Sequence, residues 1–135
     1  MKALATLALL LAVCYAVSFW QAGRRAAEAR DTYPPTGQIV QVDGRNVHVH
    51  VEGQGPDLVI IHGASGNTRD FSMSLVPQLA DSYRVLVIDR PGFGHSDALP
   101  RDGQSLADQA RHMQAAARAV GGMGPIVLGQ SYGGG

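Results

Sequence analysis

The chain has 135 residues, which suits one domain of ordinary size, and 45% of them are hydrophobic, enough to build a core. Its 11 basic and 11 acidic residues cancel to a formal net charge of +0, and the basic residues are scattered arginines with Lys2 as the only lysine, so we expect no nucleic-acid partner. Cys14 is the only cysteine, which excludes an intrachain disulfide.

The first segment, residues 3–20, is 18 residues long and carries no charge. It exceeds the apolar core of a signal peptide, about 7–15 residues, and reaches the short end of a membrane-spanning helix, about 17–25. We therefore expect residues 1–22 to form an uncleaved, single-pass membrane anchor. A cleaved signal, which would leave a secreted or periplasmic product, is the first alternative, although Cys14-Tyr15-Ala16 is only a fair cleavage site. A lipoprotein site ending at Cys14 is disfavoured by the bulky Val13 before it.

Residues 23–36 are expected to link the anchor to the rest of the chain. Their first half is rich in Ala, Arg and Glu and can extend the helix, and the Pro and Gly residues within 33–37 end it. Lys2 on one side of the anchor faces three arginines on the other (Arg24, Arg25 and Arg30). The side with more positive charges usually faces the cytoplasm, which favours a cytoplasmic position for residues 37–135. Because the difference in charge is small, it does not fix the side of the membrane.

Two antiparallel strands are predicted at the start of residues 37–135. Residues 38–43 and 47–51 alternate apolar and polar side chains around an Asp43-Gly44 turn. His48 and His50 lie on one face of the second strand, and we expect that face to be solvated rather than to bind a metal.

Buried strands then alternate with helices. Continuous apolar runs predict strands at residues 58–61, 85–88 and 126–128. A helix is expected from Asn67 or Thr68 to about Ala80, and a second from Ser105 to Gly121-Gly122. The buried stripe expected on the second helix comprises Leu106, Ala110, Met113, Ala117 and Val120. Strands separated by helices indicate a mostly parallel sheet, whose active site lies at the carboxyl ends of its strands.

The last strand runs into Gly129-Gln130-Ser131-Tyr132-Gly133, the Gly-x-Ser-x-Gly form of a nucleophile elbow. A serine at such a sharp turn has a strained backbone, and larger residues in place of the two glycines would clash. His62 and Asp89 follow the two earlier buried strands, so all three loops are expected at one edge of the sheet.

Three blocks of this sequence resemble the α/β-hydrolase family, in its serine-nucleophile branch. They are residues 62–66 (His-Gly-Ala-Ser-Gly), 89–96 (Asp-Arg-Pro-Gly-Phe-Gly-His-Ser) and 129–134. The resemblance covers residues 37–135 and implies an α/β fold: a mostly parallel sheet with an N-terminal antiparallel hairpin, ending just after the elbow. The family commonly has His before the nucleophile, where this chain has Gln130.

The resemblance also implies the roles of individual residues. Ser131 is the nucleophile, and the backbone N–H groups of Tyr132 and Ala64 form the oxyanion hole. Because the family's chain order is Ser, then acid, then His, the acid and the base are not expected within these 135 residues, and the fragment alone is expected to be inactive. We expect structural or turn roles for five other polar residues of the three blocks: His62, Asp89, His95, Ser65 and Ser96. We expect no cofactor and no metal.

The family suggests a small-molecule, acyl-type substrate: an ester, thioester, amide or activated carbon–carbon bond. Ser131 argues against haloalkane and epoxide substrates, for which the family uses Asp. A non-catalytic binding module and a membrane-anchored acyltransferase are the alternatives. The substrate itself is not determined by these residues, because the family's cap domain normally follows later in the chain.

Overall fold

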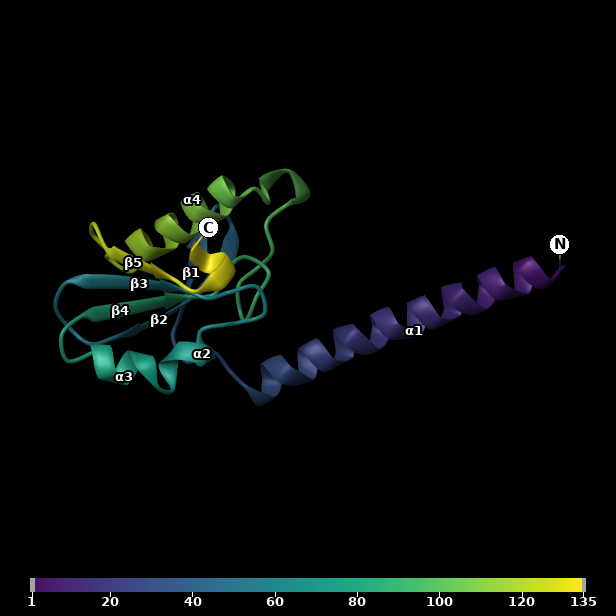
Figure 1. Ribbon diagram of the computed structural model, residues 1–135, viewed down its shortest axis with the longest axis horizontal. Helices are drawn as coiled ribbons and strands as arrows, with labels where there is room; N and C mark the ends of the chain where they lie inside the picture. The colour runs from purple at the N-terminus through teal and green to yellow at the C-terminus, as the bar shows by residue number, and fades with distance from the viewer. Residues whose placement is uncertain (1, 135) are drawn as a thin grey trace. The chain divides into compact units, whose positions relative to one another are not determined.

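The computed structural model describes residues 2–134 and divides the chain into two compact units, one up to Pro34 and one from Pro35 onward. The first unit is helix α1 (Lys2–Thr32), none of whose residues is buried (Figure 1). The Arg24 guanidinium lies 5.1 Å from the centre of the Trp20 ring. Helix α1 is long and apolar enough to cross a membrane. A signal sequence near the N-terminus would meet the same criterion of length and composition. It continues through most of the expected linker, and the proposed boundaries at residues 22 and 36 stay predictions.

The second unit is built on a five-stranded sheet with the order β1-β2-β4-β3-β5. Its strands are β1 (Gln38–Val42), β2 (Arg45–Glu52), β3 (Asp57–Ile61), β4 (Arg84–Ile88) and β5 (Ile126–Gly129). β1 pairs antiparallel with β2, and β2 with β4, whereas β3 pairs parallel with both β4 and β5. The expected parallel sheet with an N-terminal antiparallel hairpin is therefore confirmed. Asp43 and Gly44 turn that hairpin with φ of 49° and 72°, the positive values that such tight turns require.

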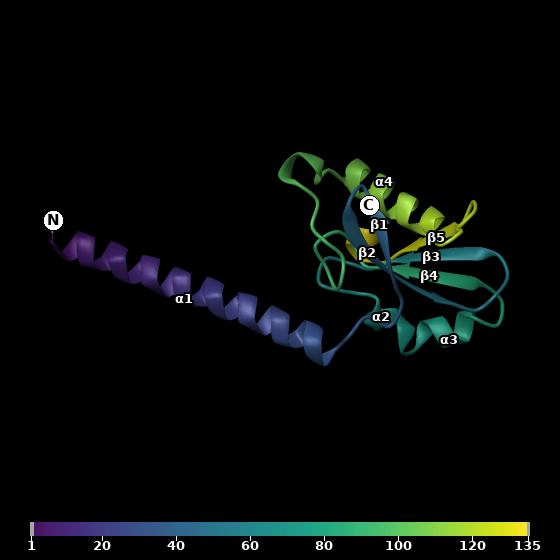
Figure 2. The ribbon, with the colours of Figure 1, turned by 180° about the vertical axis from the view of Figure 1, so that it is seen from behind.

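Helices cover both faces of this sheet (Figures 1 and 2). On one face, α4 (Leu106–Ala119) packs on a cluster that includes Val59, Leu86 and Ile88. On the other, α3 (Leu75–Leu79) places Val76 against Val85 and Val87. Alternate residues of β4 thus pack into the two clusters, as expected for a strand that is buried on both faces.

The predicted helix over residues 67–80 is interrupted. Two short helices, α2 (Arg69–Ser72) and α3, replace it, with Ser74 between them at φ −140°. The reason is Pro77, whose ring would clash with the carbonyl of Met73 in a continuous helix, but which is tolerated in the first turn of a new one.

Helix α4 starts as predicted, with the Ser105 hydroxyl accepting a hydrogen bond from the Asp108 N–H at 3.2 Å. Its buried stripe differs from the prediction. The buried residues are His112, Met113, Ala116 and Ala117, whereas Leu106 and Ala110 are exposed. Ala110 lines a cavity between α4 and β5, and within residues 2–134 no element covers that part of the helix.

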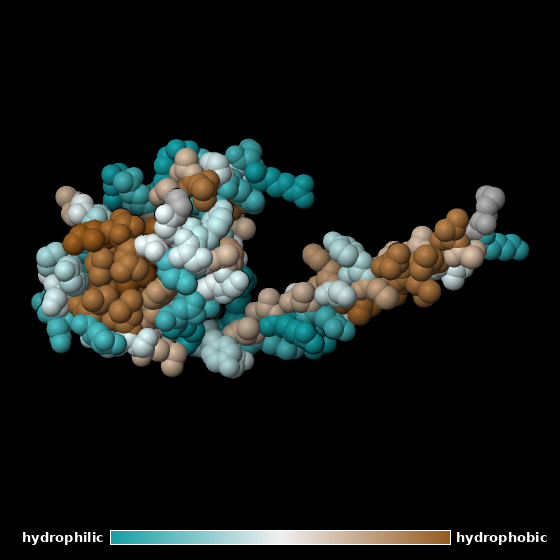
Figure 3. Space-filling model, in the orientation of Figure 1, coloured by the Kyte–Doolittle hydropathy of each residue, from teal (hydrophilic) through white to brown (hydrophobic). Residues whose placement is uncertain are grey.

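The three apolar residues of β5 are the exposed edge of the sheet rather than a buried strand. Ile126 is 55% exposed, Val127 60% and Leu128 38%. A cavity of about 510 Å³ opens between Val127 and α4, lined also by Val59, Ile61 and Met113. In Figure 3 a hydrophobic patch covers this end of the second unit. The strand predicted at residues 126–128 is therefore present, but it forms an uncovered edge of the sheet in this chain.

Candidate active site

Ser131 lies two residues after the end of β5, at the start of a single 3-10 turn, Ser131–Gly134. Its φ is +54°, a left-handed value that non-glycine residues rarely adopt, and its side chain is exposed. The strained turn expected of a nucleophile elbow is therefore present. A serine held in this way projects from the carboxyl end of the sheet.

The two motif glycines leave room for this turn. A Cβ on Gly133 would lie 2.4 Å from the Ile61 carbonyl oxygen, and one on Gly129 would lie 2.3 Å from the Gly133 oxygen. Both obstacles are backbone atoms, which cannot rotate away. Glycine at position 133 thus lets the elbow close against the end of β3, and glycine at position 129 leaves room for the Gly133 carbonyl.

The His62–Gly66 loop lies beside the serine. An ideal Cβ on Gly63 would be 3.3 Å from the Ser131 Cβ and 2.6 Å from the Gln130 side-chain oxygen. The Gly63 N–H donates to that same Gln130 oxygen at 2.8 Å. The Gln130 side chain therefore ties the elbow to the loop that carries Ala64, which is itself exposed.

His62 is fully buried and both of its ring nitrogens have partners. Nε2 accepts the Arg90 N–H at 2.9 Å, so the proton is on Nδ1, which donates to the Gly63 oxygen at 2.8 Å. Burial lowers the pKa of His62 below its usual value. The hydrogen bond to the Gly63 oxygen raises that pKa, but its effect is smaller. A neutral, fully bonded ring fits the structural role expected for this residue.

Asp89 holds the second loop from a buried position. Its carboxylate accepts from the Thr68 N–H at 2.7 Å, the His95 N–H at 3.0 Å and the His48 Nδ1 at 2.8 Å. Burial alone would raise the pKa of Asp89, but these hydrogen bonds outweigh it and hold that pKa below its usual value. Asp89 and His95 thus shape the loop, as expected.

The prediction of a solvated strand face for His48 is wrong. Its side chain is only 1% exposed, and its Nε2 accepts the Gly37 N–H at 3.1 Å. The strand pattern could not show this burial, because the cover comes from Asp89 and Gly37, which are distant in sequence. His50, two residues on, is only partly buried and contacts Glu52 at 3.1 Å.

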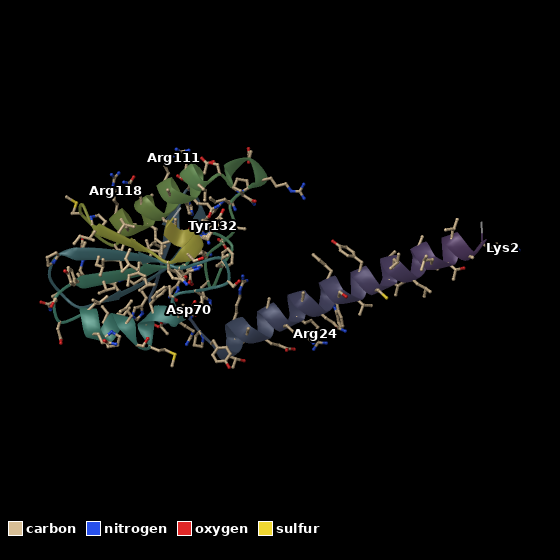
Figure 4. The ribbon with its side chains drawn as sticks, in the orientation of Figure 1. Lys2, Arg24, Asp70, Arg111, Arg118 and Tyr132 are labelled. Atoms are coloured by element: carbon tan, nitrogen blue, oxygen red, sulfur yellow. The ribbon has the colours of Figure 1, made fainter. Side chains whose placement is uncertain are left out.

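Arg90 is a site residue that the sequence analysis did not single out. Its side chain is 4% exposed, and its guanidinium lies 4.3 Å from the centre of the Tyr132 ring and 5.3 Å from that of Phe93. Tyr132 follows the candidate nucleophile and lies at the end of the sheet (Figure 4). No signal in the sequence pattern distinguishes this arginine from a surface one.

The comparisons with known proteins agree with this geometry. The family described as alpha/beta hydrolase fold matches residues 56–135. The chain is 32% identical, over 91 residues, to a 2-hydroxy-6-oxo-6-phenylhexa-2,4-dienoate hydrolase of Burkholderia cepacia, covering 65% of this chain and 32% of that protein. It is 41% identical, over 78 residues, to a pimeloyl-(acyl-carrier protein) methyl ester esterase of Chromobacterium violaceum, covering 56% and 30%.

Among solved structures, a membrane phospholipase A described as a bacterial virulence factor is similar with a TM-score of 0.66 and 29% identity, covering 99% of this chain and 45% of that one. The chain spans about a third of the length of the two curated relatives.

Proposed function

The chain belongs to the alpha/beta hydrolase fold family, and from that premise we propose that the protein is a serine hydrolase with Ser131 as its nucleophile. The observation that carries the proposal is the exposed serine at φ +54°, between two glycines and at the end of a parallel strand. In the proposed reaction the Ser131 Oγ bonds to the acyl carbon of the substrate, and its proton passes to a base. The leaving group departs protonated, and water then hydrolyses the acyl-enzyme.

The oxyanion that forms during this attack is proposed to be stabilised by the backbone N–H groups of Ala64 and Tyr132. The close approach of Gly63 to the serine supports this assignment. In a measured case, loss of one such donor costs about 100- to 1000-fold in kcat. The oxyanion hole therefore accounts for a large share of the expected rate.

The base and its acid are proposed to lie in further parts of the protein. His62 is neutral and bonded through both ring nitrogens, and His48 is buried with partners at both of its own. The curated relatives extend well beyond the matched region, which leaves room for both groups.

The substrate is proposed to be a carboxylic ester reached at a membrane. Two of the similar proteins are named as a methyl ester esterase and a membrane phospholipase A. Helix α1, exposed and apolar over most of its length, supports a place at the bilayer. We propose that α1 remains attached as a single-pass anchor.

Covalent labelling tests the nucleophile. The full-length protein should gain one fluorophosphonate adduct by intact mass, and Ser131→Ala should gain none. Ser82→Ala, which changes an exposed serine distant in sequence from the elbow, is the control and should label like the unmodified protein. Labelling that persists in Ser131→Ala would overturn the assignment. No labelling and no ester turnover in the unmodified protein would favour a binding module, and transfer of the acyl group to an added alcohol would favour an acyltransferase.

Alkaline carbonate extraction tests the anchor. The protein is expected in the pellet with its N-terminal residues intact by sequencing. A soluble product beginning near Val17 would show that the segment is a cleaved signal.

A further inference from the structure

The Gly63 carbonyl oxygen is held by three donors. The His62 Nδ1–H lies 2.8 Å away, an Arg90 Nη1–H 3.3 Å and the Gly66 N–H 3.4 Å. Gly63 itself is buried, and its own N–H is bound by Gln130. This peptide therefore has a defined orientation although it lies in a loop.

The orientation of that carbonyl fixes the direction of the next N–H. No peptide bond among the described residues is cis. In a planar trans peptide the C=O and N–H bonds point in opposite directions. With the Gly63 oxygen held towards His62 and Arg90, the Ala64 N–H must point away from them. A donor of the oxyanion hole has to be fixed in this way before the reaction begins.

Arg90 also contacts the side chain of the residue that carries the second proposed donor. Its guanidinium lies over the ring of Tyr132 at 4.3 Å, and Tyr132 supplies the other proposed N–H. A further nitrogen, Nη2, donates to the Gln109 side chain on α4 at 2.9 Å. Arg90 thus connects α4, the Gly63 loop and the elbow through one planar group.

The burial of this cation has a cost that its contacts must offset. Arg90 is 4% exposed, yet among residues 2–134 no carboxylate pairs with it. A buried charge without a counter-ion is unfavourable. Its partners are instead neutral groups: the Gln109 side chain, the Phe93 ring, the carbonyl before one proposed oxyanion donor and the ring of the residue that carries the other.

We propose that Arg90 is a positioning residue for both donors of the oxyanion hole, acting through the Gly63 carbonyl and the Tyr132 ring. This inference rests on the proposed function. It concerns the rate of the reaction rather than binding of the substrate, because the guanidinium orients groups that act on the developing oxyanion.

Steady-state kinetics of the full-length protein with p-nitrophenyl esters test the inference. Arg90→Gln should lower kcat by about 10- to 100-fold, less than complete loss of a donor, and leave KM within about twofold. Arg90→Lys keeps a cation but loses the planar fork, so an intermediate loss is expected. Inhibition by a trifluoromethyl ketone, which forms a tetrahedral adduct with the serine, should weaken in proportion to kcat/KM across the series.

The control is Arg84→Gln. Arg84 lies at the opposite end of β4, pairs with Asp57 at 2.7 Å and also binds a loop carbonyl, that of Val120. This variant should unfold more easily and keep kcat within about twofold. If both Arg90 variants fail to fold, Tyr132→Leu removes only the half-exposed ring, leaves the backbone donor, and should still lower kcat.

The outcomes separate the two proposals. If the unmodified protein shows no turnover dependent on Ser131, the proposed function fails and this inference with it. If turnover depends on Ser131 but folded Arg90 variants, or Tyr132→Leu in their place, keep kcat within about twofold, only the inference about Arg90 is overturned. A lower melting temperature with unchanged kcat would likewise reduce Arg90 to a structural role.

Discussion

At the scale of single residues, the elbow depends on the absence of a side chain at Gly133. The Ile61 and His62 carbonyl oxygens would lie 2.4 and 2.7 Å from an added Cβ, and neither can move without displacing the end of β3. The strained Ser131 conformation is thus supported by a contact between backbones, which only glycine permits.

Gly133→Ala should therefore lower the free energy of unfolding by about 2–4 kcal/mol and slow labelling of Ser131. Gly103→Ala is the matched control, because its Cβ would meet Pro100 at an ordinary 3.5 Å. That variant should stay within about 1 kcal/mol of the unmodified protein. Equal stability of the two variants in urea denaturation would contradict the proposed close approach.

His112 gives a prediction on pH. This side chain of α4 is 5% exposed, and its Nε2 has no hydrogen-bond partner among the described atoms. Burial lowers its pKa below the usual 6.5, with Asp43 opposing and Arg45 adding to the effect. Below about pH 6.5 the unfolded chain binds a proton that the folded chain resists, so stability is complete above that pH and falls as the pH decreases.

His112→Leu should remove the part of this pH-dependent loss of stability that His112 causes. Urea denaturation at pH 7.5 and 5.5 is expected to show a smaller difference than in the unmodified protein, and at pH 7.5 the variant should be at least as stable, since an unpaired buried nitrogen is gone. Gln114→Leu, an exposed position on the same helix, should keep the original difference. A variant at His112 with an unchanged pH dependence would show that this histidine does not titrate on unfolding.

At the scale of elements, the parts with a local cause were predictable from the sequence. The hairpin turn at Asp43-Gly44, the Ser105 cap and the apolar strands all depend on neighbours within a few residues. The buried His48 and the position of Arg90 were not predictable, because their partners come from distant segments. The helix break before Pro77 had a local signal that the apolar spacing of residues 71–79 obscured.

The edge strand β5 supplies the element-scale prediction. We expect further chain to cover it in the full-length protein, since the match spans only 32% of the Burkholderia cepacia relative. Val127→Lys should then improve the behaviour of the isolated segment and destabilise the full-length protein. In residues 33–135 alone, a lysine on the edge should reduce aggregation measured by light scattering. In the full-length protein the same lysine would be buried and should lower the melting temperature.

Gln38→Lys, on the exposed first residue of β1 at the other edge of the sheet, is the control and should change neither melting temperature nor aggregation strongly. If Val127→Lys leaves the full-length protein unaffected, then β5 is an exposed edge in the whole protein too.

At the scale of the whole molecule, the described residues supply some parts of the proposed catalytic site and not others. The elbow and the Gly63 loop are formed within residues 35–135. The proposed acid and base are not among them, and a serine without a base to take its proton is a weak nucleophile. Without those groups, we expect the proposed site not to turn over an acyl substrate.

Residues 33–135 alone are therefore expected to be inactive even with Ser131 intact. Loss of triad partners costs orders of magnitude in rate, and the exposed apolar residues of β5 favour association between copies. The test compares hydrolysis of p-nitrophenyl acetate by this segment and by its Ser131→Ala form, together with light scattering and thermal unfolding. Equal background rates are expected. A monomeric, cooperatively folding segment with turnover well above the Ser131→Ala form would mean that a base lies within these residues. His62 and His95 would then be the first residues to replace. For His62 to act as the base, its ring nitrogens would have to lose their hydrogen bonds to Arg90 and Gly63.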